Sequence, residues 1–353
     1  MSKVLMKGNE AIAEAALQAG CKFFFGYPIT PQNQIPEYMS KRMPQVGGTF
    51  LQAESEVAAI NMVYGASGAG ARVMTSSSSP GISLKQEGIS YIACAQLPCV
   101  IVNIVRSGPG LGGILPAQSD YFQSVKGGGH GDYRLIVYAP ASVQEAADLV
   151  MEAFEISDYY RVPAMVLGDG MIGQMMEPVE FKPVKKRDLP AKDWAATGFD
   201  QSKKKKAVIN SLYIQADEMQ AKCNELEAIY QQITKNDTLY EEFMMDDADI
   251  CIVAYGTTSR IVKNAIVAAR EIGIKVGLIR PITIWPFPTG VIKNAASKVD
   301  TFLAVEMSMG QMVEDVKLAV DGEKKTHFMG TAGGIIPTPE GVLEKIQAIA
   351  EGK

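Results

Sequence analysis

The chain has 353 residues, enough for one large domain or, more commonly at this length, two domains. Hydrophobic residues make up 47% and charged residues 21%, a globular composition with ample material for a core. The net charge of -5 argues against a nucleic-acid-binding protein, which usually needs a basic face. No apolar run reaches the roughly 18 residues that span a membrane, and the first residues lack a signal-peptide core, so we expect a cytoplasmic protein.

Short β-rich runs recur through the first half of the chain. They lie at residues 21–28, 48–52, 71–76, 98–105, 133–140 and 162–169. Helical stretches separate several of them, and Ser142 with Glu145 forms a capping box before one helix. Strands that alternate with helices predict a parallel sheet covered on both faces.

The stretch from 186 to 246 has a different character. It is polar and basic at first, with a lysine run at 203–206 that is typical of a solvated face. Apolar residues then follow a 3-4-3-4 spacing, which predicts a helix with a narrow apolar seam. These residues are Ile209, Leu212, Ala216, Met219, Cys223, Leu226, Tyr230 and Ile233. We expect this helix to pack against its own domains, and a partner-binding arm is the alternative.

A second α/β unit is predicted from residue 247 onward. Strand patterns lie at 248–256, 274–281 and 301–308, and helical patterns at 259–273 and 341–353. We therefore predict an α/β protein with two parallel-sheet domains joined by a helical linker. The boundaries are 1–185, 186–246 and 247–353.

The five cysteines include no C-x-x-C pair. They are Cys21, Cys94, Cys99, Cys223 and Cys251, and most lie in apolar runs, where a free cysteine is usually small core filler. The chain therefore lacks the ligand run of a ferredoxin-type iron–sulfur cluster.

Glu56 is an unusual residue on the buried face of a predicted helix. At 3.6 residues per turn it shares one side with Ala59, Ile60 and Val63, whereas Glu54 can face water. A buried carboxylate is costly unless it has a partner or keeps its proton. Glu56 is thus either an acid that complements the helix dipole or a functional acid, and this stretch alone leaves both readings open.

Several loops follow strand ends, where α/β proteins bind ligands. In "GYPITP", Thr30 and Pro31 suit the cap and first position of a helix. The glycine runs at 65–70 and 108–113 lack the strand-loop-helix context of a dinucleotide fingerprint. The serines of "TSSSSPG" (75–81) could approach a ligand, but the chain has only two histidines to activate a nucleophile, so we reject a hydrolase.

The "GDG" at 168–170 is found at a strand end in thiamine diphosphate enzymes, where an Asn about two dozen residues later completes a Mg²⁺ site. The corresponding region here, "PAKDWAATGF", has no Asn. We therefore interpret this GDG as a strand-end turn.

Taken together, these motifs resemble a known family. "GYPITP", "QAESEVAAINMVYGASGAGARVMTSSSSPG" and "VNIVRSGPGLGG" resemble the alpha subunit of 2-oxoacid:ferredoxin oxidoreductases, and 117–134 is similar to the 2-oxoisovalerate, branched-chain type. "VAYGTTSRIVKNA", "GLIRPITIWPFP" and "VEMSMGQM" are similar to its transketolase C-terminal-like domain. Ser79 departs from the Gly that related subunits usually have, which puts the local loop geometry in question.

The resemblance implies roles for particular residues. Glu56 would hydrogen-bond the aminopyrimidine of thiamine diphosphate, whose thiazolium carries the carbanion chemistry. Thr30, Pro28 and Ile29 would contact the cofactor, and Thr30 would also lie beside the substrate. Arg106 would bind the 2-oxoacid carboxylate, for which a guanidinium is well shaped. The rival reading of Arg106 is an ion pair, for instance with Asp120. His130, in a glycine-rich loop, is a further candidate.

The implied reaction converts a 2-oxoacid, coenzyme A and oxidised ferredoxin into acyl-CoA, CO₂ and reduced ferredoxin. By the resemblance, this chain holds the pyrimidine half of the site and no metal ligand. A beta subunit would hold the diphosphate and Mg²⁺, and gamma and ferredoxin-like delta subunits would accompany the iron–sulfur clusters, with self-association of the complex. Two alternatives stay open: 2-oxoglutarate or an arylpyruvate as substrate, and a scaffold subunit without activity.

Overall fold

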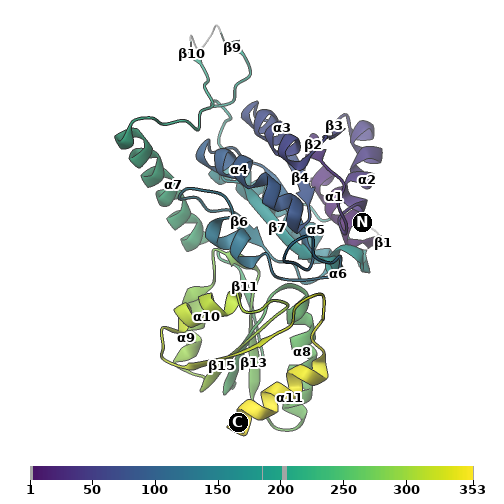
Figure 1. The fold of residues 1–353 in the computed structure, drawn as a ribbon, viewed down its shortest axis with the longest axis vertical. Helices are drawn as coiled ribbons and strands as arrows, with labels where there is room; N and C mark the ends of the chain where they lie inside the picture. Colours follow the sequence, from purple (N-terminus) through teal and green to yellow (C-terminus); the bar gives the residue numbers. More distant parts are fainter. Residues whose placement is uncertain (1–2, 185, 201–204, 353) are drawn as a thin grey trace.

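The computed structural model describes residues 3–184, 186–200 and 205–352, and it contains two α/β units (Figure 1). The first unit has a seven-stranded sheet in the order β14-β6-β7-β5-β4-β2-β3. The second has a five-stranded sheet in the order β11-β13-β12-β15-β16. Both sheets are built mainly from parallel strands, which confirms the predicted fold class.

Six strands of the first sheet overlap the six predicted runs. They are β2 (Phe23–Gly26), β3 (Thr49–Gln52), β4 (Val73–Ser77), β5 (Val100–Val105), β6 (Ile136–Tyr138) and β7 (Ala164–Asp169). Their side chains alternate between two cores: Ile101 of β5 packs on one face and Val102 on the other. The sheet is therefore buried on both sides, as its apolar runs predict.

Helices cover both faces of this sheet. Their bounds are α1 (Gly8–Gln18), α2 (Gln34–Arg42), α3 (Glu56–Gly68), α4 (Ser79–Cys94), α5 (Val143–Tyr160) and α6 (Gly170–Gln174). The α3 and α4 helices share a core with one face, whereas α1 and α5 share a core with the other. Ser142 caps α5 as predicted, because its Oγ accepts the Glu145 N–H, but Glu145 accepts the N–H of Ala141 rather than that of Ser142, so the predicted capping box is only half formed.

Three short pairings were not predicted. β1 (Val4–Lys7) pairs antiparallel with β8 (Met176–Val179), and β9 (Phe199–Asp200) pairs with β10 (Lys205–Lys206). β14 (Thr283–Trp285) lies late in the chain but pairs with β6 of the first sheet. Such edge pairings follow from chain routing, which local periodicity does not encode.

The linker helix is shorter than predicted. The α7 helix (Ala216–Asn236) begins after Ile209 and Leu212, so the prediction is wrong for those two residues. From Ala207 to Ile214 the chain is extended, and exposed residues alternate with partly buried ones, a period of two rather than 3.6. The lysine run lies partly outside the described residues. The buried seam of α7 packs on the first unit as expected, through Leu226, Tyr230 and Ile233.

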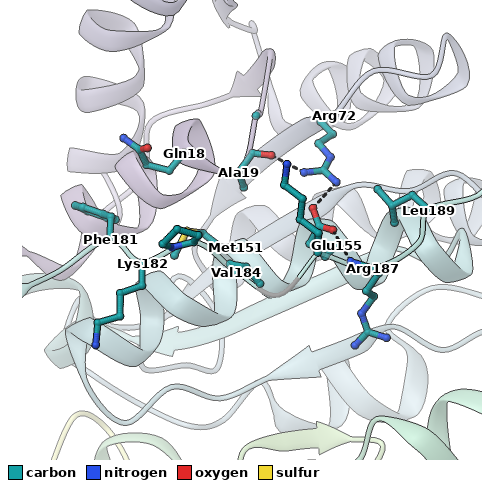
Figure 2. A pocket seen from close by; sticks show the side chains of 13 residues that line it. Gln18, Ala19, Arg72, Met151, Glu155, Phe181, Lys182, Val184, Arg187 and Leu189 are labelled. Atoms are coloured by element: carbon teal, nitrogen blue, oxygen red, sulfur yellow. Dashed lines mark hydrogen bonds and ion pairs between the residues drawn. The ribbon is translucent and has the colours of Figure 1, made fainter. Parts of the chain in front are cut away.

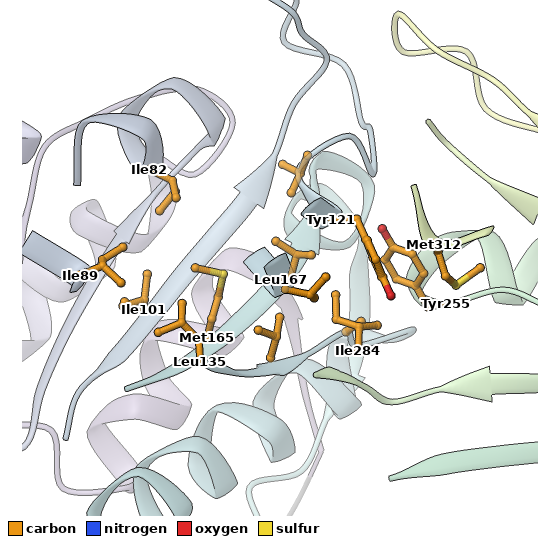
Figure 3. Packing of buried hydrophobic residues seen from close by; sticks show 14 of the residues in the cluster. Ile82, Ile89, Ile101, Tyr121, Leu135, Met165, Leu167, Tyr255, Ile284 and Met312 are labelled. Carbon is orange, nitrogen blue, oxygen red and sulfur yellow. The ribbon is translucent and has the colours of Figure 1, made fainter. Parts of the chain in front are cut away.

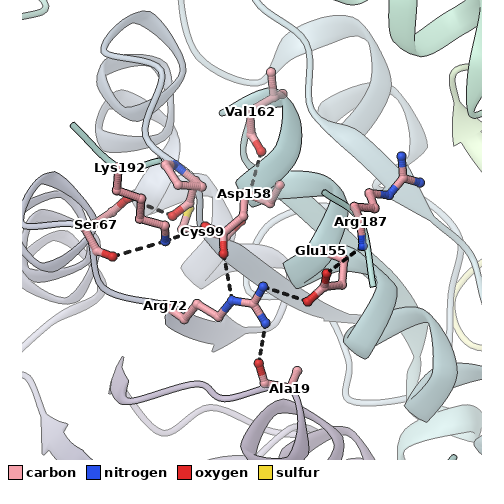
Figure 4. Close-up of polar contacts among 12 residues, drawn as sticks. Ala19, Ser67, Arg72, Cys99, Glu155, Asp158, Val162, Arg187 and Lys192 are labelled. Atoms are coloured by element: carbon pink, nitrogen blue, oxygen red, sulfur yellow. Dashed lines mark hydrogen bonds and ion pairs between the residues drawn. The ribbon is translucent and has the colours of Figure 1, made fainter. Parts of the chain in front are cut away.

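An ionic network fastens the start of the linker to the amino edge of the first sheet (Figure 4). Arg72, just before β4, pairs with Asp158 and Glu155 of α5, at 2.7 Å in each case. Lys192 of the linker also contacts Asp158 at 2.7 Å. The first part of the linker is therefore fixed to the surface of the first unit.

The second unit agrees with the predicted strand and helix positions and adds two edge strands. Its strands are β11 (Tyr240–Phe243), β12 (Ile250–Val253), β13 (Val276–Pro281), β15 (Thr301–Glu306) and β16 (Lys325–Gly330). Its helices are α8 (Gly256–Glu271), α9 (Thr289–Ala296), α10 (Met312–Val320) and α11 (Pro339–Ala350). Among the described residues, no helix is long and apolar enough to cross a membrane.

The two units share one packed interface. Figure 3 shows Tyr121 of the first unit beside Tyr255 and Met312 of the second, in a core that continues back to the strands. Buried Gln118 bonds to the Tyr255 carbonyl, to Thr258 Oγ1 and to the Met307 N–H. The segment that most resembles the branched-chain type thus begins at the interface between the units.

Candidate functional site

Glu56 opens α3, and its side chain is buried as predicted. Ser55 caps the helix by accepting the Ala58 N–H, so Glu56 lies in the first turn, where a carboxylate is favourable. Only 6% of Glu56 is exposed, whereas Glu54 is exposed. In the described part of the chain no hydrogen-bond donor reaches the Glu56 carboxylate. The dipole explains a tolerated charge here, but a nearly buried carboxylate to which no described residue donates a hydrogen bond stays available to a ligand.

Glu56 lies directly against the first turn of α4. A Cβ added to Gly81 would lie 2.6 Å from Glu56 Oε1 and 2.0 Å from Ser77 Oγ, so only glycine fits there. The hydroxyls of Ser77 and Ser78 are buried and have no hydrogen-bond partner among the described residues. This polar strand end therefore presents unused hydrogen-bonding groups beside the carboxylate.

Lys85 is an ionisable residue of this region that the sequence motifs did not identify. It is completely buried, and its Nζ donates to Thr75 Oγ1 at 2.7 Å and to the Ser76 carbonyl at 3.0 Å. Burial lowers the pKa of Lys85 to about 7, although the charge of Glu56 acts in the opposite direction. The spacing of Ile82, Lys85 and Ile89 places a lysine on an apolar helix face, and that signal could have identified it.

Arg106 follows β5, and it is only 7% exposed although it has no acidic partner among the described residues. Its guanidinium donates to the carbonyls of Thr30 and Leu111, both at 3.0 Å. Its Nε is buried and has no partner among the described residues. Neutral carbonyls do not neutralise a buried cation, so this geometry suits an incoming anion.

The rival ion pair between Arg106 and Asp120 is not present among the described residues. Asp120 instead accepts from Asn103 Nδ2 at 2.9 Å, and burial raises its pKa while bonds from Ser79 and Asn103 offset part of the rise. Ser79 Oγ bonds to both the N–H and the carbonyl of Arg106. The serine that departs from the family pattern therefore ties the start of α4 to the arginine.

Thr30 does not cap a helix, so that prediction is wrong. The α2 helix begins at Gln34 with Asn33 before it, and Pro36 rather than Pro31 occupies its first turn. The loop before α2 is held elsewhere, because Gln32 bonds to the Tyr27 carbonyl and to Ser76 Oγ. Residues 27–32 are thus fixed as a loop, partly by a long-range bond to β4, and the helix begins after them.

The structure brings this loop to Arg106 through the Thr30 backbone. The Thr30 carbonyl accepts from Arg106, whereas Thr30 and Pro28 are exposed and Ile29 is half-buried. Exposed side chains at a strand's carboxyl edge are available to a ligand. Their roles toward cofactor and substrate are taken up as proposals below.

The other motifs have structural positions. Asp169 of the GDG caps α6 by accepting from Met171 and Ile172, and burial raises its pKa. The 65–70 glycines end α3, and 108–113 forms an exposed loop, so neither precedes a helix as a nucleotide loop would. His130 is exposed and its ring lies edge-on to Tyr91, away from the carboxylate. No cluster of three or more metal-ligating side chains occurs within the described residues.

Cavity size does not locate this site. A hollow of about 600 Å³ lies between α1, α5 and the 181–189 segment, with Arg72 and Glu155 in its wall (Figure 2). Another of about 630 Å³ lies under Trp194 and Lys222. Neither is lined by Glu56 or Arg106. The unpaired polar groups identify the site instead.

Known proteins match this chain along its whole length. Residues 14–242 match the family described as pyruvate flavodoxin/ferredoxin oxidoreductase, thiamine diphosphate-binding, and residues 248–342 match core domain II of pyruvate:ferredoxin oxidoreductase. The ketoisovalerate oxidoreductase subunit VorB of Methanothermobacter marburgensis is 49% identical over 350 residues, 99% of each chain. The 2-oxoglutarate synthase subunit KorA of Methanothermobacter thermautotrophicus is 35% identical over 366 residues, 97% of each chain.

A solved structure supports the fold. The 2-oxoglutarate:ferredoxin oxidoreductase from Magnetococcus marinus superposes with a TM-score of 0.87 at 23% identity. The match covers 98% of this chain and 65% of that chain, so this chain spans about two thirds of the longer protein. At this identity the likeness shows the fold alone. With the sequence matches, it follows that the chain belongs to the thiamine diphosphate-binding pyruvate flavodoxin/ferredoxin oxidoreductase family.

Proposed function

We propose that the chain is the alpha-type subunit of a coenzyme A-dependent 2-oxoacid:ferredoxin oxidoreductase that acts on 2-oxoisovalerate. The observation that carries the proposal is that the chain holds both a nearly buried Glu56, to which no described residue donates a hydrogen bond, and a buried Arg106 whose Nε is unused among the described residues. A scaffold subunit needs neither group. The complex would form acyl-CoA and CO₂ and reduce ferredoxin, and we infer that it works in the cytoplasm.

Glu56, Thr30, Pro28 and Ile29 would hold the pyrimidine half of thiamine diphosphate, and the unpartnered Ser77 and Ser78 hydroxyls leave polar capacity for it. The cofactor, when bound, supplies the carbanion chemistry. A carboxylate in a dry pocket shares its proton with a ring nitrogen rather than with water. Arg106 would orient the 2-oxoacid by its carboxylate, with Thr30 beside it.

Other subunits complete this enzyme in the proposal. The beta subunit would hold the diphosphate and Mg²⁺, and gamma and ferredoxin-like delta subunits would accompany the iron–sulfur clusters, in a self-associating complex. Residues 1–185 would form the pyrimidine-type domain, 186–246 the linker and 247–353 the transketolase C-terminal-like domain. We expect the isolated chain to bind thiamine diphosphate poorly in calorimetry, and tight Mg²⁺-dependent binding by it alone would contradict this division.

An apolar substrate is favoured by the loop after Arg106. Leu111, Ile114 and Leu115 are all more than half exposed, and the Leu111 carbonyl bonds to the guanidinium. Apolar side chains beside a carboxylate-binding group suit a branched-chain 2-oxoacid better than the second carboxylate of 2-oxoglutarate. Assays of the assembled complex with 2-oxoisovalerate, 2-oxoglutarate and an arylpyruvate would rank the three, and a preference for 2-oxoglutarate would overturn this choice.

The activity itself is tested by two neighbouring glutamates. Glu56→Gln in the assembled complex should slow exchange of the cofactor's C2 proton by on the order of 10²-fold, the scale of general acid–base effects. Glu54→Gln is the matched control, because Glu54 is exposed two residues away. Equal behaviour of the two variants would refute the role of Glu56.

A further inference from the structure

Lys85 has no role in the proposed function, yet its position is costly. Its ammonium is 0% exposed and bonds to Thr75 Oγ1 and the Ser76 carbonyl, both neutral acceptors. No carboxylate lies within ion-pair distance of it among the described residues. Burying a cation without a contacting anion is unfavourable, so a compensating charge at longer range is expected.

Glu56 is the charged group that acts on Lys85. Lys85 follows Gly81 by one helical turn on α4, and the Glu56 carboxylate lies on Gly81. A second glycine, Gly88, also faces α3, since a Cβ there would lie 2.6 Å from Ile60. The two helices therefore pack closely at Gly81 and Gly88, and an acid and an amine attract each other more strongly in such a packed interior than in water.

We propose that Lys85 is a positioning residue whose buried ammonium attracts the Glu56 carboxylate and fixes it in the site. An anionic carboxylate accepts a hydrogen bond and so favours a proton on the ligand nitrogen that faces it. This inference rests on the proposed function in one respect, that Glu56 is the acid that meets the cofactor ring.

The competing explanation is purely structural: Lys85 could serve only to satisfy Thr75 and Ser76 on β4. Thr75→Val removes the hydroxyl acceptor and keeps the charge, so it reproduces the structural loss without the electrostatic one. Lys85→Met removes the charge and keeps the length of the side chain. The two substitutions separate the explanations.

A double-mutant cycle on the full chain without cofactor measures the coupling. Urea unfolding at pH 6, where Lys85 is mostly protonated, would compare Glu56→Gln in the wild-type, Lys85→Met and Thr75→Val backgrounds. We expect Glu56→Gln to raise the unfolding equilibrium constant about tenfold more when Lys85 is present than in Lys85→Met, and to behave as in wild type in Thr75→Val. Independent, multiplicative effects of Glu56→Gln and Lys85→Met would overturn the proposal.

A second measurement needs no Lys85 variant and stays decisive if Lys85→Met does not fold. NMR of ¹⁵N-lysine would follow the Nζ titration of Lys85 in the full chain. Glu56→Gln should lower its midpoint by about one pH unit, a tenfold change in proton affinity, whereas Glu54→Gln should leave it unchanged. An unmoved midpoint in Glu56→Gln would overturn the proposal.

These readouts are independent of the proposed function. If Glu56 and Lys85 are not coupled but Glu56→Gln still strongly slows C2-proton exchange, the role of Lys85 is refuted and that of Glu56 stands. If the two residues are coupled but Glu56→Gln does not slow C2-proton exchange, the catalytic role of Glu56 is refuted and its coupling to Lys85 stands. In the assembled complex, Lys85→Met should lower kcat with the KM for the 2-oxoacid little changed, because Lys85 acts through Glu56 and not on the substrate.

Discussion

Two arginines at opposite edges of the same sheet differ in how their charge is met. Arg72 precedes β4 at the amino edge and pairs with two carboxylates, Glu155 and Asp158. Arg106 follows β5 at the carboxyl edge and has only backbone carbonyls as partners, with its Nε unused. The less exposed arginine is thus the one without an acid, since the Arg72 side chain is 19% exposed and Arg106 is 7% exposed.

This difference separates a structural charge from one held for a ligand. Burial lowers the pKa of Arg72, but the bonds from Glu155 and Asp158 more than offset this, so its pKa is raised overall. The amino-edge network is complete within the chain (Figure 4). The carboxyl edge gathers unpaired Arg106, Ser77 and Ser78 groups instead. The two edges differ in whether their buried polar and charged groups have partners, and not in burial or cavity size.

Arg106→Ala offers the largest expected effect and the strictest test of this contrast. Loss of a carboxylate contact should cost roughly 2–5 kcal/mol in kcat/KM for the 2-oxoacid, with the KM for coenzyme A little changed. Steady-state kinetics of the assembled complex measures this, and thermal unfolding serves as the control. A normal 2-oxoacid KM, or a failure to assemble, would instead place Arg106 among the structural charges.

Arg72→Met should give the opposite pattern. Removing it leaves buried Glu155 without an ion-pair partner among the described residues and buried Asp158 with Lys192 alone, so the free energy of unfolding should fall by about 2–4 kcal/mol. The kcat of the complex that remains folded should be unchanged, because Arg72 lies at the other edge of the sheet. Denaturant unfolding and kinetics on the same preparation check both statements. A loss of kcat comparable to that of Arg106→Ala would show that the two arginines do not differ in role.

Lys85 predicts a pH dependence of stability. Its pKa is about 7 when folded against an ordinary 10.5, so between these values the unfolded chain binds more protons and stability rises with pH. The slope is at most about 1.4 kcal/mol per pH unit, and it ends below about 7 and above 10.5, where both states carry the same charge. Measuring the free energy of unfolding of wild type and Lys85→Met from pH 6.5 upward isolates the contribution of Lys85. If the two free energies changed with pH in parallel, that contribution would be excluded.

Ser79→Ala should have the smallest effect. It removes two hydrogen bonds to the Arg106 backbone without altering the guanidinium partners, so we expect about 0.5–1.5 kcal/mol less stability and a change in kcat/KM below about threefold. Ser83→Ala, on the exposed side of the same helix, is the control. A loss near that of Arg106→Ala would mean that the serine positions the arginine for catalysis.

Local sequence patterns alone determined much of this molecule. The six strand runs of the first unit, the helix cap at Ser142 and the buried face of Glu56 all follow from periods of two and 3.6 and from cap chemistry. These features depend on residues a few positions apart, so neighbours in sequence suffice to specify them. Placement of Glu56 and Arg106 at strand and helix ends was predictable for the same reason.

The tertiary structure decided what depends on residues far apart in the chain. Gln32, in the loop before α2, bonds to Ser76 of β4, and β14 crosses from the second unit to pair with β6. Whether a buried charge finds a partner is also a long-range matter. Arg72 meets Asp158, 86 residues away, whereas Arg106 meets no acid among the described residues. The absence of a partner cannot be read from a pattern of neighbours, because it requires every side chain that folds toward the site to be in place.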